Sequence, residues 1–446
     1  MMKKILIIGA GRSATSLIAY LIARAEKFNW EVSICEQNEG LKAERLKEFP
    51  GLTSESVDIL DEASREGVFS HYQLVISMLP ASMHIHPAST CAKLGINMIT
   101  ASYLSDDILA LSEQFEQNSA VLIMEMGLDP GIDHMSAMKV LDRLALEGHE
   151  LTAFETFTGG LLAEDREKDN PWHYKFTWNP RNVVMAGTGN VKFIQEGRYK
   201  YIPYHKLFSR TEIIHIPGHG YFEGYANRDS LKYLDLYKLH DINTLYRGTL
   251  RRPGFCKTWD VFVQLGATDD TYEMEGVEKM THRQFINSFL SYNPFDSVEL
   301  KLAHYMNFGL ESEEMYRLKW LGIFEDEAVG LEKGTPAQIL EHILKKKWTL
   351  DTSDRDLIVM WHKFDFLDKG KPKQIQAHMV ATGENETDTA MSKTVGLPMA
   401  IAAKFILTGE IEKTGVQIPT VKDIYEPVLG ELEELGFEFS ERETIS

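Results

Sequence analysis

Residues 4–14 read KILIIGAGRSA, an apolar run that stops at a glycine-rich turn. Residues 4–8 have the continuous apolar pattern of a buried parallel strand, and residues 16–27 follow with the helical spacing of Leu17, Leu21 and Ala25. A strand, a turn of the pattern G-x-G-x-x-G/A and a helix together indicate a dinucleotide-binding unit. An ordinary glycine-rich turn, the alternative, would not need these flanking elements. We therefore expect the chain to begin with a Rossmann domain.

The residues of this turn suit a bound pyrophosphate. Gly9 permits a tight turn, Gly11 lets the pyrophosphate approach the backbone, and Ala14 is small enough for the helix to pack on the strand. The amino terminus of the helix then offers N–H groups and a positive dipole end to the phosphates. Glu36 ends the next predicted strand, where an acid can accept hydrogen bonds from both ribose hydroxyls. The alternative for Glu36 is a solvated charge at a strand end.

The pattern of apolar runs predicts an α/β protein with more than one domain. Short runs alternate with helix-like segments at residues 31–35, 74–79, 97–100 and 121–124. This alternation implies a parallel sheet with crossover helices, which we assign to residues 1–130.

A different rhythm after residue 130 predicts a second domain. Strand-like segments, several of them rich in Thr, Tyr, Phe and Trp, occupy residues 152–158, 174–178, 213–225, 356–365 and 374–382. Such segments suit a mixed or antiparallel sheet. We expect residues 131–393 to form a second α/β domain for substrate binding and dimerisation, with a helical lobe at about 254–347. Residues 394–446 should form helices that return to the Rossmann domain, starting with an apolar helix at 394–407.

Composition narrows the function classes. The 446 residues carry a formal net charge of −19, which argues against a nucleic-acid binder, although a few local arginines could still bind an anionic small molecule. The three cysteines, Cys35, Cys91 and Cys256, form no C-x-x-C pair, so we expect neither disulfides nor a cysteine-rich zinc site, and a reduced cytoplasmic setting. We find no apolar stretch that approaches the length of a membrane-spanning helix and expect no membrane partner.

Longer motifs point to a family. The most specific is GLDPGIDH at residues 127–134, and the others are TASYLS at 100–105, GGL at 159–161, NP at 170–171, YKFTW at 174–178, NRDS at 227–230, RGTLR at 247–251 and TVGLP at 394–398. In this order, from the first strand to the last helix, they resemble the saccharopine dehydrogenase family, and within it the glutamate-forming saccharopine reductases.

The resemblance implies an oxidoreductase of lysine metabolism that works as a homodimer. The aldehyde of 2-aminoadipate 6-semialdehyde condenses with the amine of glutamate, and hydride from NAD(P)H reduces the imine to saccharopine; the reverse reaction oxidises and hydrolyses saccharopine. Residue by residue, the resemblance assigns the cofactor to Ala10, Gly11, Arg12, Ser13, Glu36, Gln37, Asn38, Asp58, Ile59, Leu79, Ala101, Ser102, Leu128, Asp129, Pro130 and Trp178. It assigns the substrate to Ser102, Tyr103, Asp129, Arg228, Thr249, Leu250 and Arg251.

The chain departs from the family at a few positions. Gln37 stands where the fungal proteins carry an arginine, Ala81 replaces a tyrosine, and Thr158 replaces a cysteine. NADP is the family habit, but Glu36 without a neighbouring cation at Gln37 favours NAD. We therefore predict that NAD(H) is used at least as well as NADP(H), with Arg12 as the nearby cation that could reverse this.

The chemistry of the proposed substrate fits these side chains. Saccharopine has three carboxylates, which arginine forks such as those of Arg228 and Arg251 can bind with two hydrogen bonds each. Asp129 could hold an ammonium group or accept a proton, and its alternative is a turn residue that caps the next helix. Tyr103 could donate to a carboxylate or a carbinolamine, and its alternative is a half-buried aromatic. No general acid–base is assigned beyond these two candidates, since the substrate's own amines or water could serve.

Histidines raise the question of a metal. His84 and His86 could lie on one side of a strand, but no carboxylate or cysteine has supporting spacing, so we expect no metal site and interpret the histidines as surface or supporting residues.

Two other functions stay open: a related imine-reducing dehydrogenase acting on an amino acid or a carboxylated polyamine, and a non-catalytic dinucleotide-binding protein.

Overall fold

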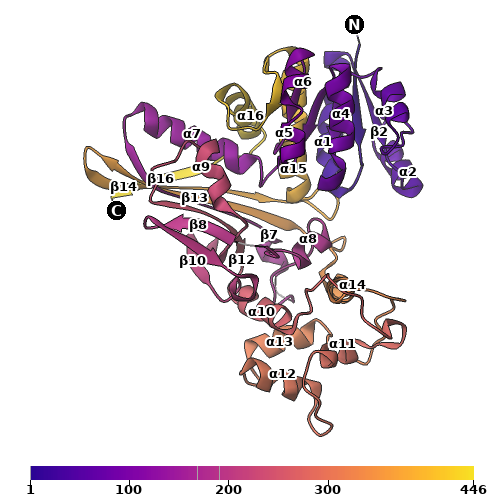
Figure 1. The fold of residues 1–446 in the computed structure, drawn as a ribbon, viewed down its shortest axis with the longest axis vertical. Coiled ribbons are helices and arrows are strands. Elements are labelled where there is room, and N and C mark those ends of the chain that lie inside the picture. Colours follow the sequence, from indigo (N-terminus) through magenta and orange to yellow (C-terminus); the bar gives the residue numbers. More distant parts are fainter. Residues whose placement is uncertain (1, 168, 190, 446) are drawn as a thin grey trace. The chain divides into compact units, whose positions relative to one another are not determined.

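The computed structural model describes residues 2–167, 169–189 and 191–445, which divide into two compact units (Figure 1). The first unit comprises Met1–Glu150 and Met379–Ser440, and the second comprises Leu151–His378 and Glu441–Ser446. The division falls at residue 150 rather than at the predicted 130, because helix α7 (Ile132–Leu146) packs on α16 (Lys422–Glu434) of the same unit.

A seven-stranded sheet forms the centre of the first unit. Every strand pair in it is parallel, and the order is β15-β6-β5-β4-β1-β2-β3. The strands are β1 (Lys3–Ile8), β2 (Trp30–Cys35), β3 (Thr53–Ser54), β4 (Leu74–Ser77), β5 (Asn97–Thr100), β6 (Val121–Ile123) and β15 (Gly415–Gln417). The chain runs from β1 outward to β3, then crosses to β4 and runs outward the other way. This is the Rossmann order, and ligands of such sheets bind at the carboxyl edge beside the reversal. The predicted α/β class is confirmed.

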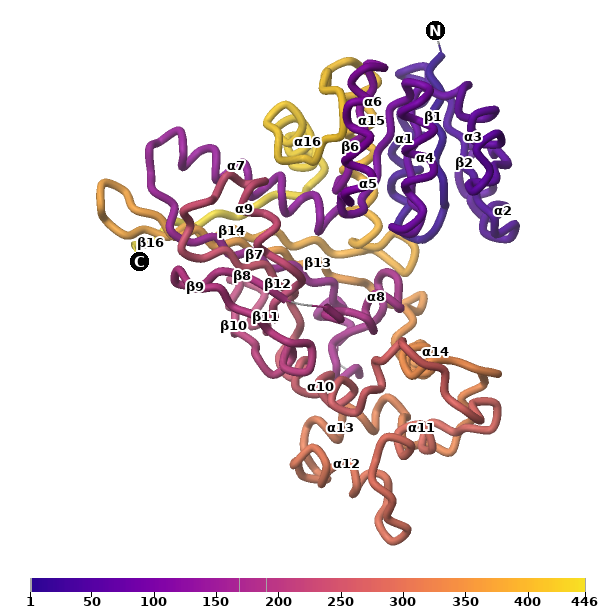
Figure 2. Tube along the Cα trace, viewed as in Figure 1, coloured from indigo at the N-terminus to yellow at the C-terminus, as the bar shows by residue number. Residues whose placement is uncertain are grey.

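Helices pack around this sheet, and one of them comes from near the end of the chain. They are α1 (Thr15–Phe28), α2 (Glu39–Glu48), α3 (Glu62–Phe69), α4 (Ile85–Leu94), α5 (Asp106–Leu109), α6 (Ser112–Gln117), α7, α15 (Ala390–Thr408) and α16. Figure 2 shows α15 in orange beside the indigo α1, and the two helices are in contact. At Gly396 of α15, an added Cβ would lie 2.9 Å from Leu17 N and 3.1 Å from Ser13 O. Glycine therefore permits this close approach of α15 to the start of α1.

Helix α15 also corrects one expectation from the sequence. It has 19 residues, and its most apolar window of 18 residues has a mean hydropathy of 1.3, so that among the described residues it is long and apolar enough to cross a membrane. However, 78% of its most apolar window is buried inside the protein, as in the core helix of a soluble fold. The helix begins at Ala390, four residues before the predicted start at residue 394, so its full apolar length was not predicted.

The second unit is built on a mixed sheet of order β10-β11-β12-β7-β13-β14-β16, with β8 paired to β12 and β9. Strands β12 and β7 are parallel, whereas β11 and β12 are antiparallel, as expected for the mixed sheet that the sequence predicted. The strands are β7 (Glu150–Leu162), β8 (Val191–Gln195), β9 (Arg198–Ile202), β10 (Thr211–Ile216), β11 (Gly220–Ala226), β12 (Thr244–Arg251), β13 (Asp356–Asp368), β14 (Lys371–Thr382) and β16 (Ser440–Ile445).

Two strand-related predictions were wrong. Residues 174–178 form no strand beyond an isolated bridge between Phe176 and Thr349, because Tyr174 and Phe176 pack edge-on against Trp348 instead. Residues 394–446 are not all helical as expected, since they also contain β15 (Gly415–Gln417) and a strand that starts at Ser440, β16, which pairs with β14.

The predicted helical lobe of the second unit is confirmed. Side-chain caps explain several of its helix starts: Thr281 and Thr335 form capping boxes with a glutamine three residues later, and Ser297 and Ser312 cap the helices between them. The helices of the lobe are α10 (Phe255–Leu265), α11 (His282–Ser288), α12 (Val298–Met306), α13 (Glu313–Trp320) and α14 (Pro336–Trp348), and the shorter α8 (Pro180–Val184) and α9 (Tyr233–Leu236) precede it.

Candidate functional site

The glycine-rich turn lies at the carboxyl end of β1 and has room for a ligand. Gly9 has a φ of +89°, which favours glycine, and its N–H donates to Cys35 O at 2.8 Å. A Cβ on Gly11 would meet nothing within 4 Å. Since no packing among the described residues requires glycine at position 11, the space there fits the close approach of a pyrophosphate.

The backbone donors of this turn divide into two groups. The N–H of Ala14 donates to Gly11 O at 2.9 Å, and the N–H of Ser16 donates to the Ser392 hydroxyl of α15 at 3.1 Å. The N–H groups of Gly11, Arg12 and Ser13, which precede Ala14 in the turn, are the candidates to bind phosphate oxygens at the start of α1. The predicted pyrophosphate residues therefore lie on one short segment, and the exposed Arg12 adds a positive charge to it.

Glu36 faces this turn from the end of β2. Its Oε2 accepts the N–H of Ala10 at 2.8 Å, and its Oε1 accepts the N–H of Asn38 at 2.9 Å. Each carboxylate oxygen keeps a second lone pair, so Glu36 can still accept ribose hydroxyls. The Asn38 side chain caps α2 by accepting the N–H of Leu41 at 3.0 Å, while Gln37 is exposed.

Two cations on α2, the helix that follows Glu36, were not predicted as part of the site. Arg45 is buried, and its Nε donates to Ala10 O at 3.2 Å while its guanidinium pairs with Glu48 at 2.5 Å. Lys42 pairs with Glu39 at 2.6 Å. The sequence signal for these two cations was their spacing of three residues, which puts Lys42 and Arg45 on one side of α2.

Two further cofactor predictions lie along the same edge. Asp58 is exposed and its Oδ1 accepts the N–H of Leu60 at 2.9 Å, whereas the Ile59 side chain is buried. Leu79 is half-buried, in the segment between β4 and the short 3-10 helix Ala81–Met83. Asp58 and Ile59 follow β3 in the chain, and Leu79 follows β4.

Tyr103 and Asp129 meet beyond the ends of β5 and β6. The Tyr103 hydroxyl donates to Asp129 Oδ1 at 3.2 Å, and both side chains are half-buried. Their loops touch closely, because a Cβ on Gly127 would lie 2.8 Å from the Cβ of Ala101. Gly131, not Asp129, occupies the cap position of α7. The structure therefore brings Ser102, Tyr103 and Asp129 to one edge of the sheet.

A buried network that was not predicted from the sequence connects these two loops. Glu125 Oε1 accepts the N–H of Leu104 at 2.9 Å, and its Oε2 lies 2.7 Å from His134 Nε2. Asp133 Oδ1 accepts the N–H of Gly131 at 2.6 Å. Glu125 and His134 are both buried, so the network holds the backbone beside Tyr103 against the segment that carries Asp129. The sequence signal for this network was the acid–histidine pair that ends the GLDPGIDH motif, Asp133 and His134.

His84 is one of the histidines interpreted above as surface or supporting residues, and the structure places it inside the protein. It lies at the cap position of α4 rather than in a strand, and its side chain is 1% exposed. Within residues 2–167, 169–189 and 191–445, no group of three or more His, Cys, Asp or Glu side chains is arranged to hold a metal ion. The absence of a metal site stays a prediction.

In the second unit, β12 presents predicted substrate residues on a buried polar side of the sheet. Alternation along the strand puts Thr249 and Arg251 on one side, and Leu250, which is fully buried against Gly159, on the other. Neighbouring strands place Thr158 and Tyr225 level with Thr249.

Arg251 is 5% exposed, and its guanidinium lies 4.9 Å from the centre of the Tyr174 ring and 5.2 Å from that of Phe255. It donates to Leu250 O at 2.9 Å, whereas its Nε, the Thr158 hydroxyl and the Tyr174 hydroxyl have no hydrogen-bond partner among the described residues. Buried polar atoms are normally paired, so this side of the sheet is suited to a polar ligand.

The other two predicted residues of the second unit are more exposed. Arg228 is exposed after β11 with a φ of +54°, and its carbonyl accepts the N–H of Lys192 at 3.1 Å. Trp178 is 41% exposed in the segment before α8.

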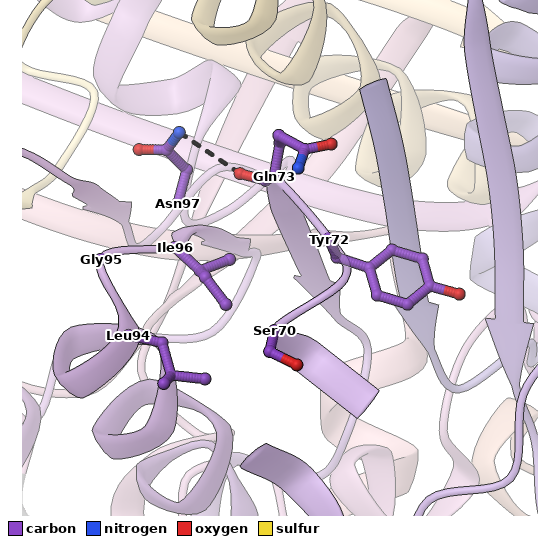
Figure 3. A pocket seen from close by; sticks show the side chains of 7 residues that line it. All are labelled: Ser70, Tyr72, Gln73, Leu94, Gly95, Ile96 and Asn97. Carbon is purple, nitrogen blue, oxygen red and sulfur yellow. Dashed lines mark hydrogen bonds between the residues drawn. The ribbon is translucent and has the colours of Figure 1, made fainter. Parts of the chain in front are cut away.

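A hollow of about 320 Å³ lies elsewhere in the first unit. Figure 3 shows the side chains that line it. Its lining includes Gln73 and Asn97, which are joined by a hydrogen bond of 3.4 Å from Asn97 Nδ2 to Gln73 O. These residues stand at the amino ends of β4 and β5, opposite the edge where Rossmann sheets bind cofactors. The hollow is therefore not the cofactor site.

Comparison with known proteins agrees with this architecture. Residues 5–123 match the saccharopine dehydrogenase NADP binding domain, and residues 127–437 match the saccharopine dehydrogenase C-terminal domain. The mitochondrial alpha-aminoadipic semialdehyde synthase of Rattus norvegicus is 31% identical over 99% of this chain, but the chain spans only 48% of that relative's length. The chain thus spans about half the length of such curated relatives.

Fungal relatives match along most of their length. Saccharopine dehydrogenase (NADP(+), L-glutamate-forming) of Saccharomyces cerevisiae is 28% identical over 97% of both chains. The structure of apo saccharopine dehydrogenase (L-Glu forming) from the same yeast matches with a TM-score of 0.89 and 26% identity, covering 99% of this chain and 100% of the yeast chain. The chain belongs to the saccharopine dehydrogenase family.

Proposed function

We propose that this protein catalyses the reversible NAD(P)-dependent oxidation of saccharopine to L-glutamate and 2-aminoadipate 6-semialdehyde. The observation that carries the proposal is the Tyr103–Asp129 pair, held at the carboxyl edge of a Rossmann sheet by the buried Glu125 network. Family membership over both domains, and relatives named for this activity, support it.

A nicotinamide dinucleotide, which the turn at Gly11, Arg12 and Ser13 would hold, would supply the acceptor for a hydride from the carbon next to the secondary amine of saccharopine. Loss of that hydride leaves an iminium, to which water adds to give a carbinolamine. The carbinolamine collapses to the aldehyde as the C–N bond breaks, and the amine of glutamate takes up a proton. Asp129, with Tyr103 donating to it, is placed to hold an ammonium group or to accept a proton.

The second unit has the chemistry to bind the substrate's carboxylates. Arg251 carries its charge into a buried aromatic surrounding, where a charge-assisted hydrogen bond is stronger than in water. Its Nε and the Thr158 hydroxyl have no partner among the described residues and so suit an anionic ligand. We assign Arg251 and Thr249 to substrate binding, with Arg228 as a second, exposed cation.

We further propose that NAD(H) is used at least as well as NADP(H), although relatives are named for NADP(+). The Glu36 carboxylate beside the turn would meet a 2′-phosphate with like charge. Lys42 and Arg45 could offset this charge, but both are already paired with glutamates on α2. A homodimer in a reduced cytoplasmic setting, where the buried thiols stay free, completes the proposal.

The test uses the purified full-length chain with saccharopine and either NAD⁺ or NADP⁺. Reduced cofactor should accumulate, seen by its absorbance, together with an equal amount of glutamate. Turnover of a different secondary amine, with none of saccharopine, would assign the protein to another branch of the family. If the protein binds a dinucleotide but turns over no secondary amine, only the alternative of a non-catalytic dinucleotide-binding protein remains.

A further inference from the structure

A buried imidazole joins three side chains at the carboxyl ends of β4 and β5. His84 Nδ1 lies 2.9 Å from the Ser77 hydroxyl, and His84 Nε2 lies 2.6 Å from the Ser102 hydroxyl. The Thr100 hydroxyl is a third partner, 3.3 Å from Nε2. Ser77 and Thr100 are the last residues of adjacent strands and are paired in register. The imidazole therefore lies across the edge where this sheet is expected to bind its cofactor.

These bonds connect two loops that leave the sheet at neighbouring positions. The bond to Ser77 closes the segment 78–83, which contains Leu79, and the bond to Ser102 fixes the loop that follows β5. Ser102 is half-buried, unlike His84, so its hydroxyl stands between the buried imidazole and the edge of the sheet. One side chain thus sets the relative position of both loops.

The imidazole is suited to hold hydroxyls rather than to carry charge. Burial lowers the pKa of His84 to about 4, so the ring is neutral near neutral pH. A neutral imidazole has one N–H donor and one acceptor nitrogen, and serine hydroxyls can match either role. Both ring nitrogens therefore have partners in either tautomer, which makes the orientation of Ser102 well defined.

We propose that His84 is a positioning residue for the reaction: it orients the Ser102 hydroxyl and holds the two loops that form the nicotinamide end of the site. This proposal rests on the proposed function only where saccharopine turnover is measured, because the effect of each variant on cofactor binding can be measured without saccharopine. His84 touches neither substrate nor cofactor in this account and acts through Ser102.

The experiment compares four full-length variants: His84→Ala, Ser102→Ala, the double variant, and His84→Gln, whose amide can replace part of the hydrogen bonding. His86→Ala is the matched control, since His86 is a half-buried histidine two residues away on the same helix. NADH affinity is measured by fluorescence titration, kcat and KM by saccharopine turnover, and folding by thermal melting.

His84→Ala should lower NADH affinity and kcat/KM by about tenfold to a hundredfold, the usual effect of leaving buried hydrogen-bonding groups unpaired. Ser102→Ala should do the same, and the double variant should be no worse than Ser102→Ala alone. His84→Gln should recover part of the loss, and His86→Ala should match the wild type.

A purely structural role gives a different pattern. In that case His84→Ala would have a lower melting temperature, and its losses of NADH affinity and kcat/KM would add in full to those of Ser102→Ala. Additive losses, or wild-type NADH affinity in His84→Ala, overturn the proposal. If His84→Ala does not fold, His84→Gln with and without Ser102→Ala supplies the same comparison. Absence of saccharopine turnover in the wild type would refute the proposed function, while the NADH titrations would still decide the role of His84.

Discussion

Gly396→Ala tests how closely α15 supports the cofactor turn. The new Cβ would lie 2.9 Å from Leu17 N and 3.1 Å from Ser13 O, and both of these are backbone atoms that cannot rotate away. Either α15 must move outward or the start of α1 must shift. Because Ser13 belongs to the turn that is expected to bind pyrophosphate, the strain should appear in NADH binding as well as in stability.

The magnitude is a balance of two terms. Overpacking a tight contact costs roughly 1–3 kcal/mol, while replacing a glycine inside a helix by alanine gains about 0.5–1 kcal/mol. The free energy of unfolding of the first unit should therefore fall by about 0.5–2 kcal/mol, a decrease of roughly 2–6 °C in its melting temperature. Scanning calorimetry measures this change, and the transition that NADH shifts upward identifies the first unit.

The chain offers a matched control in the same unit. Gly430 lies in α16, is exposed, and would meet nothing within 4 Å as alanine. Gly430→Ala should therefore stabilise the protein by about 0.5–1 kcal/mol and leave NADH binding unchanged. The two substitutions are chemically identical, so opposite signs would isolate the packing term. A Gly396→Ala protein as stable as Gly430→Ala, with normal NADH affinity, would refute the reasoning.

Four other variants test the proposed site. Asp129→Asn should preserve melting temperature and NADH affinity but impair saccharopine turnover, because shape is kept and charge is lost; unchanged kinetic constants would remove Asp129 from the mechanism. Arg228→Ala and the size-conserving Arg251→Met should each weaken saccharopine binding by one to two decades, since a charge-assisted pair contributes about 1.5–3 kcal/mol, with NADH titration as the control. Glu36→Ala combined with Gln37→Arg should shift the ratio of kcat/KM values toward NADP⁺; a wild type that already strongly prefers NADP⁺ would show that cations nearby neutralise the 2′-phosphate.

Local sequence patterns were sufficient to predict those elements whose structure depends on residues close together in the chain. The strand–turn–helix of residues 4–27 was predicted because burial, a positive φ at Gly9 and helical periodicity each leave a local signal. The parallel sheet followed from the alternation of strands and helices. The strand predicted at residues 174–178 is absent for the converse reason. Aromatic residues suit a strand, but here they pack against Trp348, which is far away in the chain.

Within the first unit, the sequence alone determined the fold class, the cofactor turn and the acid at the end of β2. Only the tertiary structure decided that Glu36 binds the backbone of that turn, that Glu125 and His134 tie Tyr103 to Asp129, and that His84 is buried between two strand ends. The physical reason is that a hydrogen bond depends on distance in space. A histidine in a linear sequence has the same residue type whether it faces water or three hydroxyl groups, and only the folded chain distinguishes the two.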